Sequence, residues 1–169
     1  MNTRFYAKIE NIKFNLIIIT VGLSVSNRLF SFLSHCCLNL FVSESNIIVV
    51  TVDFRLLPLH PLPAAYEDGW TSLQWIASHT SNDTYNNNFE RESWLLDYGD
   101  FDKVYVGDVN CANIAHDLAM RAESETLPNN LKILGALLCC PFFWASTPIG
   151  SEPVEEHESS LAMKVWNFV

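Results

Sequence analysis

The sequence predicts an α/β fold in which a mostly parallel β-sheet carries helices on both faces. Several apolar runs rich in β-branched residues lack a two-residue alternation, which is typical of strands buried on both faces. Helical segments separate these runs, and strands that alternate with helices form parallel sheets. With 169 residues, of which 49% are hydrophobic, the chain is long enough to bury one core.

The first strand is expected at residues 16–21, inside an apolar segment that spans residues 14–25. Arg4, Lys8 and Lys13 precede this segment, so it also has the pattern of a signal peptide. It is too short to cross a bilayer, because a membrane-spanning helix needs about 20 apolar residues. We interpret it as a buried strand of the sheet.

A second strand is expected at residues 47–53, where a β-branched run ends before a proline-rich turn. The helix predicted at residues 64–78 places Trp70, Leu73 and Ile76 on one face. The other predicted elements are helices at residues 30–43 and 113–122, strands at residues 103–107 and 133–140, and a polar loop at residues 80–88.

Residues 106–116 (VGDVNCANIAH) have the pattern of a nucleophile elbow, in which a strand turns sharply into a helix around the motif G-x-S-x-G. Gly107 is the first glycine of that motif, Val109 is the tip, and Cys111 stands where the second glycine would be. Valine has no oxygen and no proton to abstract, so no base can activate it for acyl transfer. Its branched side chain also resists a strained tip conformation.

Two other interpretations of this segment stay open. It could be an ordinary strand, turn and helix start, with Asp108 or Asn110 capping the helix. Cys111 could act as a substitute nucleophile, but it lies beyond the tip, and a buried, inert thiol is the simpler interpretation.

Residues 47–70 (IIVVTVDFRLLPLHPLPAAYEDGW) carry a longer motif. They resemble the D-Y-R-L-A-P-E-H-P-x-P-A-A-x-x-D segment of the hormone-sensitive-lipase-like α/β-hydrolases. Residues 93–106 are similar to the segment that precedes the elbow in that family, and residues 141–144 and 148–153 resemble its next strand end and lid-proximal loop. The resemblance is nearest to the plant carboxylesterases, including the 2-hydroxyisoflavanone dehydratase-like members and, more distantly, the gibberellin receptors.

The resemblance implies a partial, truncated and degenerate α/β-hydrolase fold. Residues 14–169 would form the N-terminal part of a fold-3 domain, and residues 1–13 are left unassigned. Intact family members hydrolyse small carboxylic esters through a Ser, His and Asp triad, with no metal and no cofactor. Their oxyanion loop carries a histidine and three glycines, and only Gly22 remains in the corresponding region here.

The resemblance also places the catalytic aspartate and histidine of the family beyond residue 169. We therefore expect that this copy is catalytically inactive. Two alternatives remain, a non-catalytic protein that binds a small ligand in the manner of gibberellin receptors, and a fragment of a complete active esterase. The expected partner is a small ester or hormone-like molecule. Because a partial sheet leaves apolar surface exposed, self-association is also expected.

Net charge and cysteine content indicate which partners and which cellular compartment to expect. The formal net charge is −9, so the chain lacks the clustered basic residues that a nucleic-acid interface needs. The five cysteines follow neither a zinc-site spacing nor an even disulfide framework, which favours free thiols in a reducing, cytoplasmic location.

Four polar residues around the proline-rich turn and the elbow helix are also expected to have structural roles. The resemblance gives Asp53 and Arg55 a role in fixing the proline-rich turn, and a solvated pair at the strand end is the alternative. His60 and His116 are expected to pack rather than to act as bases.

Overall fold

The computed structural model describes residues 3–6, 14–20, 29–45, 47–55, 59–80, 92–108 and 112–139. These residues form a five-stranded sheet in the order β1-β3-β2-β4-β5. The strands are β1 (Thr3–Tyr6), β2 (Phe14–Thr20), β3 (Ile47–Val52), β4 (Gly99–Asp108) and β5 (Ile133–Leu138). β1 is antiparallel to β3, and the other strands are parallel to their neighbours, so the predicted, mostly parallel sheet is confirmed.

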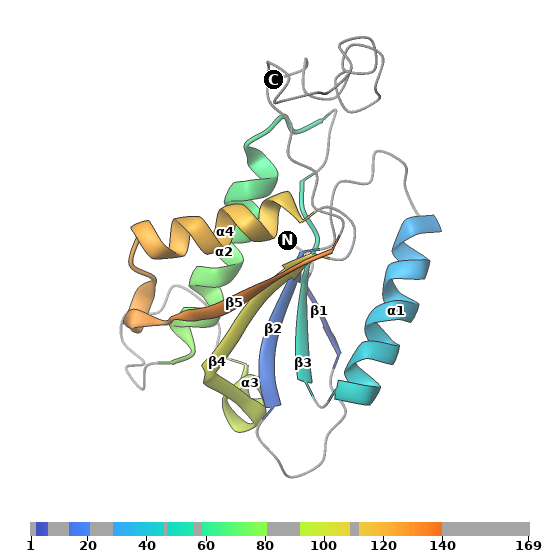
Figure 1. Ribbon diagram of the computed structural model, residues 1–169, viewed down its shortest axis with the longest axis horizontal. Helices are drawn as coiled ribbons and strands as arrows, with labels where there is room; N and C mark the ends of the chain where they lie inside the picture. The colour runs from blue at the N-terminus through green and yellow to red at the C-terminus, as the bar shows by residue number, and fades with distance from the viewer. Residues whose placement is uncertain are drawn as a thin grey trace, which may run out of the picture.

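Helices cover both faces of the sheet, as the sequence predicts. The helices are α1 (Leu29–Ser45), α2 (Ala64–Ser78), α3 (Ser93–Tyr98) and α4 (Asn113–Ser124), and a 3-10 turn, η1, spans Pro128–Asn130. α1 packs against β1 and β3 on one face, whereas α2 and α4 pack together on the other (Figure 1).

Most predicted elements agree with the structure to within a few residues, and α2 agrees at both ends. The apolar segment that also resembled a signal peptide forms β2, between β3 and β4. β4 is longer than predicted because Gly99 and Asp100 pair with Phe14 and Asn15 ahead of a register shift. β1, α3 and η1 are not among the predicted elements, because each is too short to produce a clear hydrophobic period.

The core lies between the sheet and the layer formed by α2 and α4. Every residue of β3 is buried, as expected for a parallel strand covered on both faces. The predicted face of α2 is confirmed, because Trp70, Leu73 and Ile76 are all buried and belong to the same core cluster as Val104 and Val106 of β4.

Gly69 allows α2 and α4 to approach closely. A Cβ atom on Gly69 would lie 3.1 Å from Cδ1 of Leu118 and 3.4 Å from Cγ2 of Ile114. On the outer side of the same contact, Arg121 of α4 donates a 3.0 Å hydrogen bond to Glu67 of α2, and its guanidinium lies 4.5 Å from the ring centroid of Trp70. The two helices are therefore held together by close apolar packing within and by Arg121 at the surface.

Replacing Leu118 with alanine tests the importance of this helix layer. Leu118 is 0% exposed, and we expect Leu118→Ala to lower the free energy of unfolding by about 2–5 kcal/mol, because it removes buried contacts and leaves a cavity. Met120 lies on the same helix but is 56% exposed, so Met120→Ala should change stability by less than about 0.5 kcal/mol. Urea unfolding of the three proteins measures both values. Equal losses for the two variants would contradict the described α4 orientation.

Candidate active site

Four strands end in line at the carboxyl edge of the sheet. Thr20 at the end of β2 is in register with Val52 of β3 and with Asp108 of β4. Asp108 in turn is in register with Leu138 of β5. The segments that follow these strands therefore all leave the sheet at one edge.

The chain reverses its direction across the sheet at β2. From β2 it passes through α1 to β3 on one side, and from β3 it passes through α2 and α3 to β4 on the other side of β2. In open α/β sheets, ligands bind at the carboxyl edge where the strand order reverses. The segment after β2, which contains Gly22, and the segment after β4, which begins with Val109, both start at this edge of the sheet.

The local setting of a nucleophile elbow is present at the end of β4. The strand ends at Asp108 and α4 begins at Asn113, so four residues connect strand to helix. Gly107 is buried, and the amide of His116 donates a 2.9 Å hydrogen bond to the carbonyl of Ala112 in the first turn of α4. A strand that is followed after four residues by a helix is what a G-x-S-x-G motif requires of its surroundings.

The predicted site residues divide into two groups. Gly107 and Asp108 form the end of β4. Val109, Asn110, Cys111 and Gly22 lie outside the described residues, so the assignment of Val109 to the tip stays a prediction from the sequence. The alternative interpretation predicted Asp108 or Asn110 as the N-cap of α4. The N-cap residue in the structure is Ala112.

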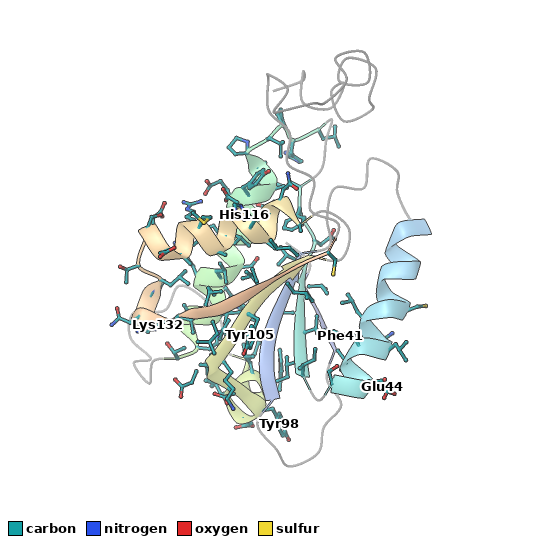
Figure 2. The ribbon with its side chains drawn as sticks, viewed as in Figure 1. Phe41, Glu44, Tyr98, Tyr105, His116 and Lys132 are labelled. Atoms are coloured by element: carbon teal, nitrogen blue, oxygen red, sulfur yellow. The ribbon has the colours of Figure 1, made fainter. Side chains whose placement is uncertain are left out.

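The two histidines expected to pack are exposed, and that expectation is wrong. α4 turns Ile114, Ala115 and Leu118 into the core, which directs His116 away from it (Figure 2). His60 is exposed in the turn that precedes α2. Neither residue contributes to the core cluster.

Arg55 fixes the turn after β3, but its partner is Asp68 of α2. The backbone amide of Arg55 donates a 2.8 Å hydrogen bond to Oδ2 of Asp68, and its Nε donates a 2.9 Å bond to Oδ1. Its Nη2 lies 2.7 Å from the same Oδ1. Asp53 is exposed, and the described contacts of Arg55 do not include it. Asp68 is the final aspartate of the quoted family motif, so the motif contains both members of this pair but does not show that they are in contact.

These contacts lower the pKa of Asp68. Burial alone would raise the pKa of this carboxyl, but the hydrogen bonds and positive charge of Arg55, together with the charge of His60, hold it below the usual value. The ionised form of Asp68 is therefore the one that the folded chain favours.

Other chemistry is not assembled in the described part of the chain. Among those residues, no group of three or more His, Cys, Asp and Glu side chains is arranged to hold a metal ion. Cys36 and Cys139 are free thiols there. None of the described helices is long and apolar enough to cross a bilayer.

The sequence matches the alpha/beta hydrolase fold family over residues 24–167. The chain belongs to this family. It is 65% identical over 140 residues to a 2-hydroxyisoflavanone dehydratase of Glycine max, and 50% identical over 141 residues to one of Glycyrrhiza echinata. A probable carboxylesterase of Arabidopsis thaliana is 40% identical over 136 residues. The chain is thus a carboxylesterase-like member of the hormone-sensitive-lipase-like group, as the sequence motifs predict.

Each match covers most of this chain but only about half, or less, of the other protein. The match to the Glycine max protein covers 82% of this chain and 43% of that protein. The fold is similar to that of the carboxylesterase EstE1 from a metagenomic library, with a TM-score of 0.66, 20% identity and coverage of 98% of this chain and 52% of the esterase. An esterase from Pyrobaculum calidifontis gives a TM-score of 0.63 at 24% identity, covering 96% of this chain and 46% of that enzyme. The chain spans about half the length of these proteins, or less.

The Arg55–Asp68 pair predicts a specific dependence of stability on pH. Because the folded-state pKa of Asp68 is depressed, the stabilisation is present above the unfolded pKa, about 4, and is lost as pH falls through the folded-state pKa. We expect Asp68→Asn to flatten the fall in the free energy of unfolding between about pH 5 and pH 2. Asp53→Asn, which removes an exposed carboxylate close by, should keep the wild-type slope. Urea unfolding across this pH range would contradict the pair if both variants gave the same slope.

Proposed function

We propose that this chain keeps the scaffold of the carboxylesterases but does not catalyse acyl transfer through an elbow nucleophile. One observation supports the proposal. The first residue after β4 is Val109, in the short connection to α4 where this family presents its nucleophile. Any longer chain that contains this segment carries the same Val109, so the proposal applies to it as well.

The physical reason is that acyl transfer needs an atom that can attack a carbonyl carbon. An isopropyl group offers no lone pair, and a base close to it has no proton to remove. Stabilisation of an oxyanion would also be weaker, because the region after β2 keeps Gly22 in place of a glycine-rich loop. Loss of one oxyanion donor costs about 3 kcal/mol of transition-state stabilisation.

An ester hydrolysis assay tests this proposal. We expect purified chain to hydrolyse p-nitrophenyl acetate and butyrate no faster than the same chain after thermal unfolding. Val109→Ser should also lack activity, because a serine without a complete oxyanion loop and a positioned base is not activated. A cooperative thermal melt of both proteins shows that inactivity is not a failure to fold.

The control for this assay is Cys111→Ala. Hydrolysis by the wild-type chain that disappears in Cys111→Ala would make Cys111 a nucleophile and would overturn the proposal. Hydrolysis that appears only in Val109→Ser would show that the oxyanion site and the base are intact, which contradicts the expected weak oxyanion stabilisation but leaves valine as the reason for the inactive wild type.

A second candidate is the binding of a small molecule at the carboxyl edge between β2 and β4. The register of Thr20 with Asp108 keeps the two strand ends adjacent at the reversal of the sheet, whether or not a nucleophile follows. The 65% identity to a protein named as a 2-hydroxyisoflavanone dehydratase suggests a polycyclic phenolic ligand of that kind.

Titration with a 2-hydroxyisoflavanone tests this candidate. We expect saturable binding in isothermal titration calorimetry, weakened at least tenfold (about 1.4 kcal/mol) by Val109→Trp, which puts a much larger side chain at the first residue after β4. Leu59→Trp is the matched control, because Leu59 is strongly exposed in the turn before α2. Binding that does not saturate, or that both variants weaken alike, contradicts a ligand site at this edge. Release of water and formation of the isoflavone would show a dehydratase instead of a binding protein.

A further inference from the structure

His79 is a buried histidine at the junction between α2 and α3. It is the residue that follows the last residue of α2, and it is 1% exposed. Among the buried side chains of the described residues, it alone can change its charge near neutral pH. The contacts of its ring therefore decide whether this junction can accommodate a positive charge.

Both ring nitrogens of His79 face backbone groups. Nδ1 lies 2.8 Å from the carbonyl oxygen of Trp75, one turn back in α2, and Nε2 accepts a 3.0 Å hydrogen bond from the amide of Glu92. A carbonyl oxygen can only accept a hydrogen bond, and a backbone amide can only donate one. The ring is therefore neutral, with its proton on Nδ1. The hydroxyl of Ser78 lies 3.4 Å from Nδ1 but donates to the Trp75 carbonyl at 2.6 Å, so it leaves this assignment unchanged.

The amide that His79 binds belongs to the residue from which α3 starts. Glu92 is the N-cap of α3, and its carbonyl accepts hydrogen bonds from the amides of Leu95 at 3.1 Å and Leu96 at 3.3 Å. Leu95 is buried in the core cluster. β4 follows α3 directly (Figure 1). The contact with His79 thus fixes the first turn of α3 to the end of α2.

A second proton on the ring would make this contact repulsive. Nε2 would then carry an N–H that points at the N–H of Glu92, and neither group can accept from the other. The hydrogen bond would be lost, and two donors would face each other in a site that is closed to water. Protonation of the ring and closure of the junction therefore exclude each other.

Three neighbouring groups favour a positive ring without removing this conflict. They are the carbonyl groups at the C-terminal end of α2, the ring of Trp75, whose centroid lies 4.6 Å from that of His79, and the carboxylate of Glu92. The Glu92 carboxylate accepts a 3.0 Å hydrogen bond from Nε1 of Trp94. η1, which also packs on α2, carries no ionisable residue. The charged ring is thus stabilised at the end of α2 once the Glu92 amide has moved away.

We propose that His79 is a pH-sensitive contact between two helices, in which the neutral ring holds the start of α3 to the end of α2 and protonation of the ring releases it. The packing of α2 on α4 at Gly69 lies ten residues earlier in α2, about 15 Å along the helix, so release does not require that layer to separate. The proposal does not involve Val109, so it can fail or succeed without affecting the proposed function.

The pH at which release begins follows from ordinary histidine chemistry. In an open junction the ring is exposed to water, where the pKa of a histidine is about 6.5, whereas the closed junction does not take up the proton. Because the open form binds one more proton, its population relative to the closed form rises about tenfold for each pH unit below 6.5. At the other end of α2, Arg55 holds the pKa of Asp68 below its usual value. Acid therefore releases the C-terminal end of α2 before it affects the Arg55–Asp68 pair.

Amide hydrogen exchange at Glu92 tests the proposal. Protection factors, which divide out the pH dependence of chemical exchange, are measured by NMR on the 169-residue chain between about pH 7.5 and pH 5. We expect the protection factor of the Glu92 amide to fall about 30-fold over this range. The nitrogen chemical shifts of the His79 ring should show a neutral Nδ1–H tautomer at pH 7.5. An Nε2–H tautomer, or a doubly protonated ring while the Glu92 amide is still protected, would overturn the proposal.

Two substitutions distinguish His79 from other titrating groups. His79→Gln supplies an amide oxygen that can accept from the Glu92 amide but does not titrate, so the protection factor should no longer depend on pH. His116→Gln removes an exposed histidine of α4 and should keep the wild-type fall. A wild-type protection factor that does not change with pH, an equal fall in His79→Gln, or loss of the fall in His116→Gln would overturn the proposal. The wild-type exchange and ring measurements decide it even if His79→Gln does not fold.

Discussion

A parallel sheet is stable only when both of its faces are kept from water, and most features of this molecule follow from that constraint. β3 meets it fully, since all six of its residues are buried between neighbouring strands and helices. The α2–α4 layer meets it for β4, because Gly69 allows the two helices to pack closely over Val104 and Val106. Among the strands whose side chains the structure describes, β5 meets it least, since Leu134 and Leu137 are exposed. The same constraint thus explains both the core and the contrast between β3 and β5.

The scaffold of the site and its chemistry are separable in this chain. The reversal at β2 aligns Thr20 and Asp108 at one edge, and the four-residue connection to α4 follows from the strand and helix boundaries. None of these features depends on which side chain occupies the tip of the turn. A chain can therefore lose the nucleophile and keep the fold, because function depends on particular side chains within a shared fold.

The sequence predicted those parts of the structure that depend on long hydrophobic patterns. β2, β3 and α2 are regular elements with clear apolar patterns, and their composition identifies them directly. α3 was missed because six residues give less than two helical turns. Asp68 was missed as the partner of Arg55 because the two are thirteen residues apart, and only the fold brings them together. The roles of Val109 and Gly22 stay predictions, because both residues lie outside the described part of the chain and could be assigned only from their place in a motif.

His79 was also missed, since an isolated histidine at a helix end carries no pattern. It is 1% exposed, and its Nε2 accepts a 3.0 Å hydrogen bond from the amide of Glu92. Its Nδ1 lies 2.8 Å from the carbonyl of Trp75, so Nδ1 carries the proton of a neutral ring and donates it there. A charged ring would place an N–H against the amide of Glu92, so the neutral form is the one that fits.

α2 is therefore held at both ends, and this determines where α4 lies. Near its N-terminus the Arg55–Asp68 pair joins it to the chain that leaves β3, and beyond its C-terminus His79 joins it to the start of α3. Between these two ends of α2, Leu118 of α4 packs against Gly69. α4 follows β4 after a connection of four residues, so the position of α2 constrains where the helix after β4 begins. The ion pair of Arg55, an exposed residue outside the expected catalytic set, thus supports the position of α4 through α2 and the contact of Gly69 with Leu118.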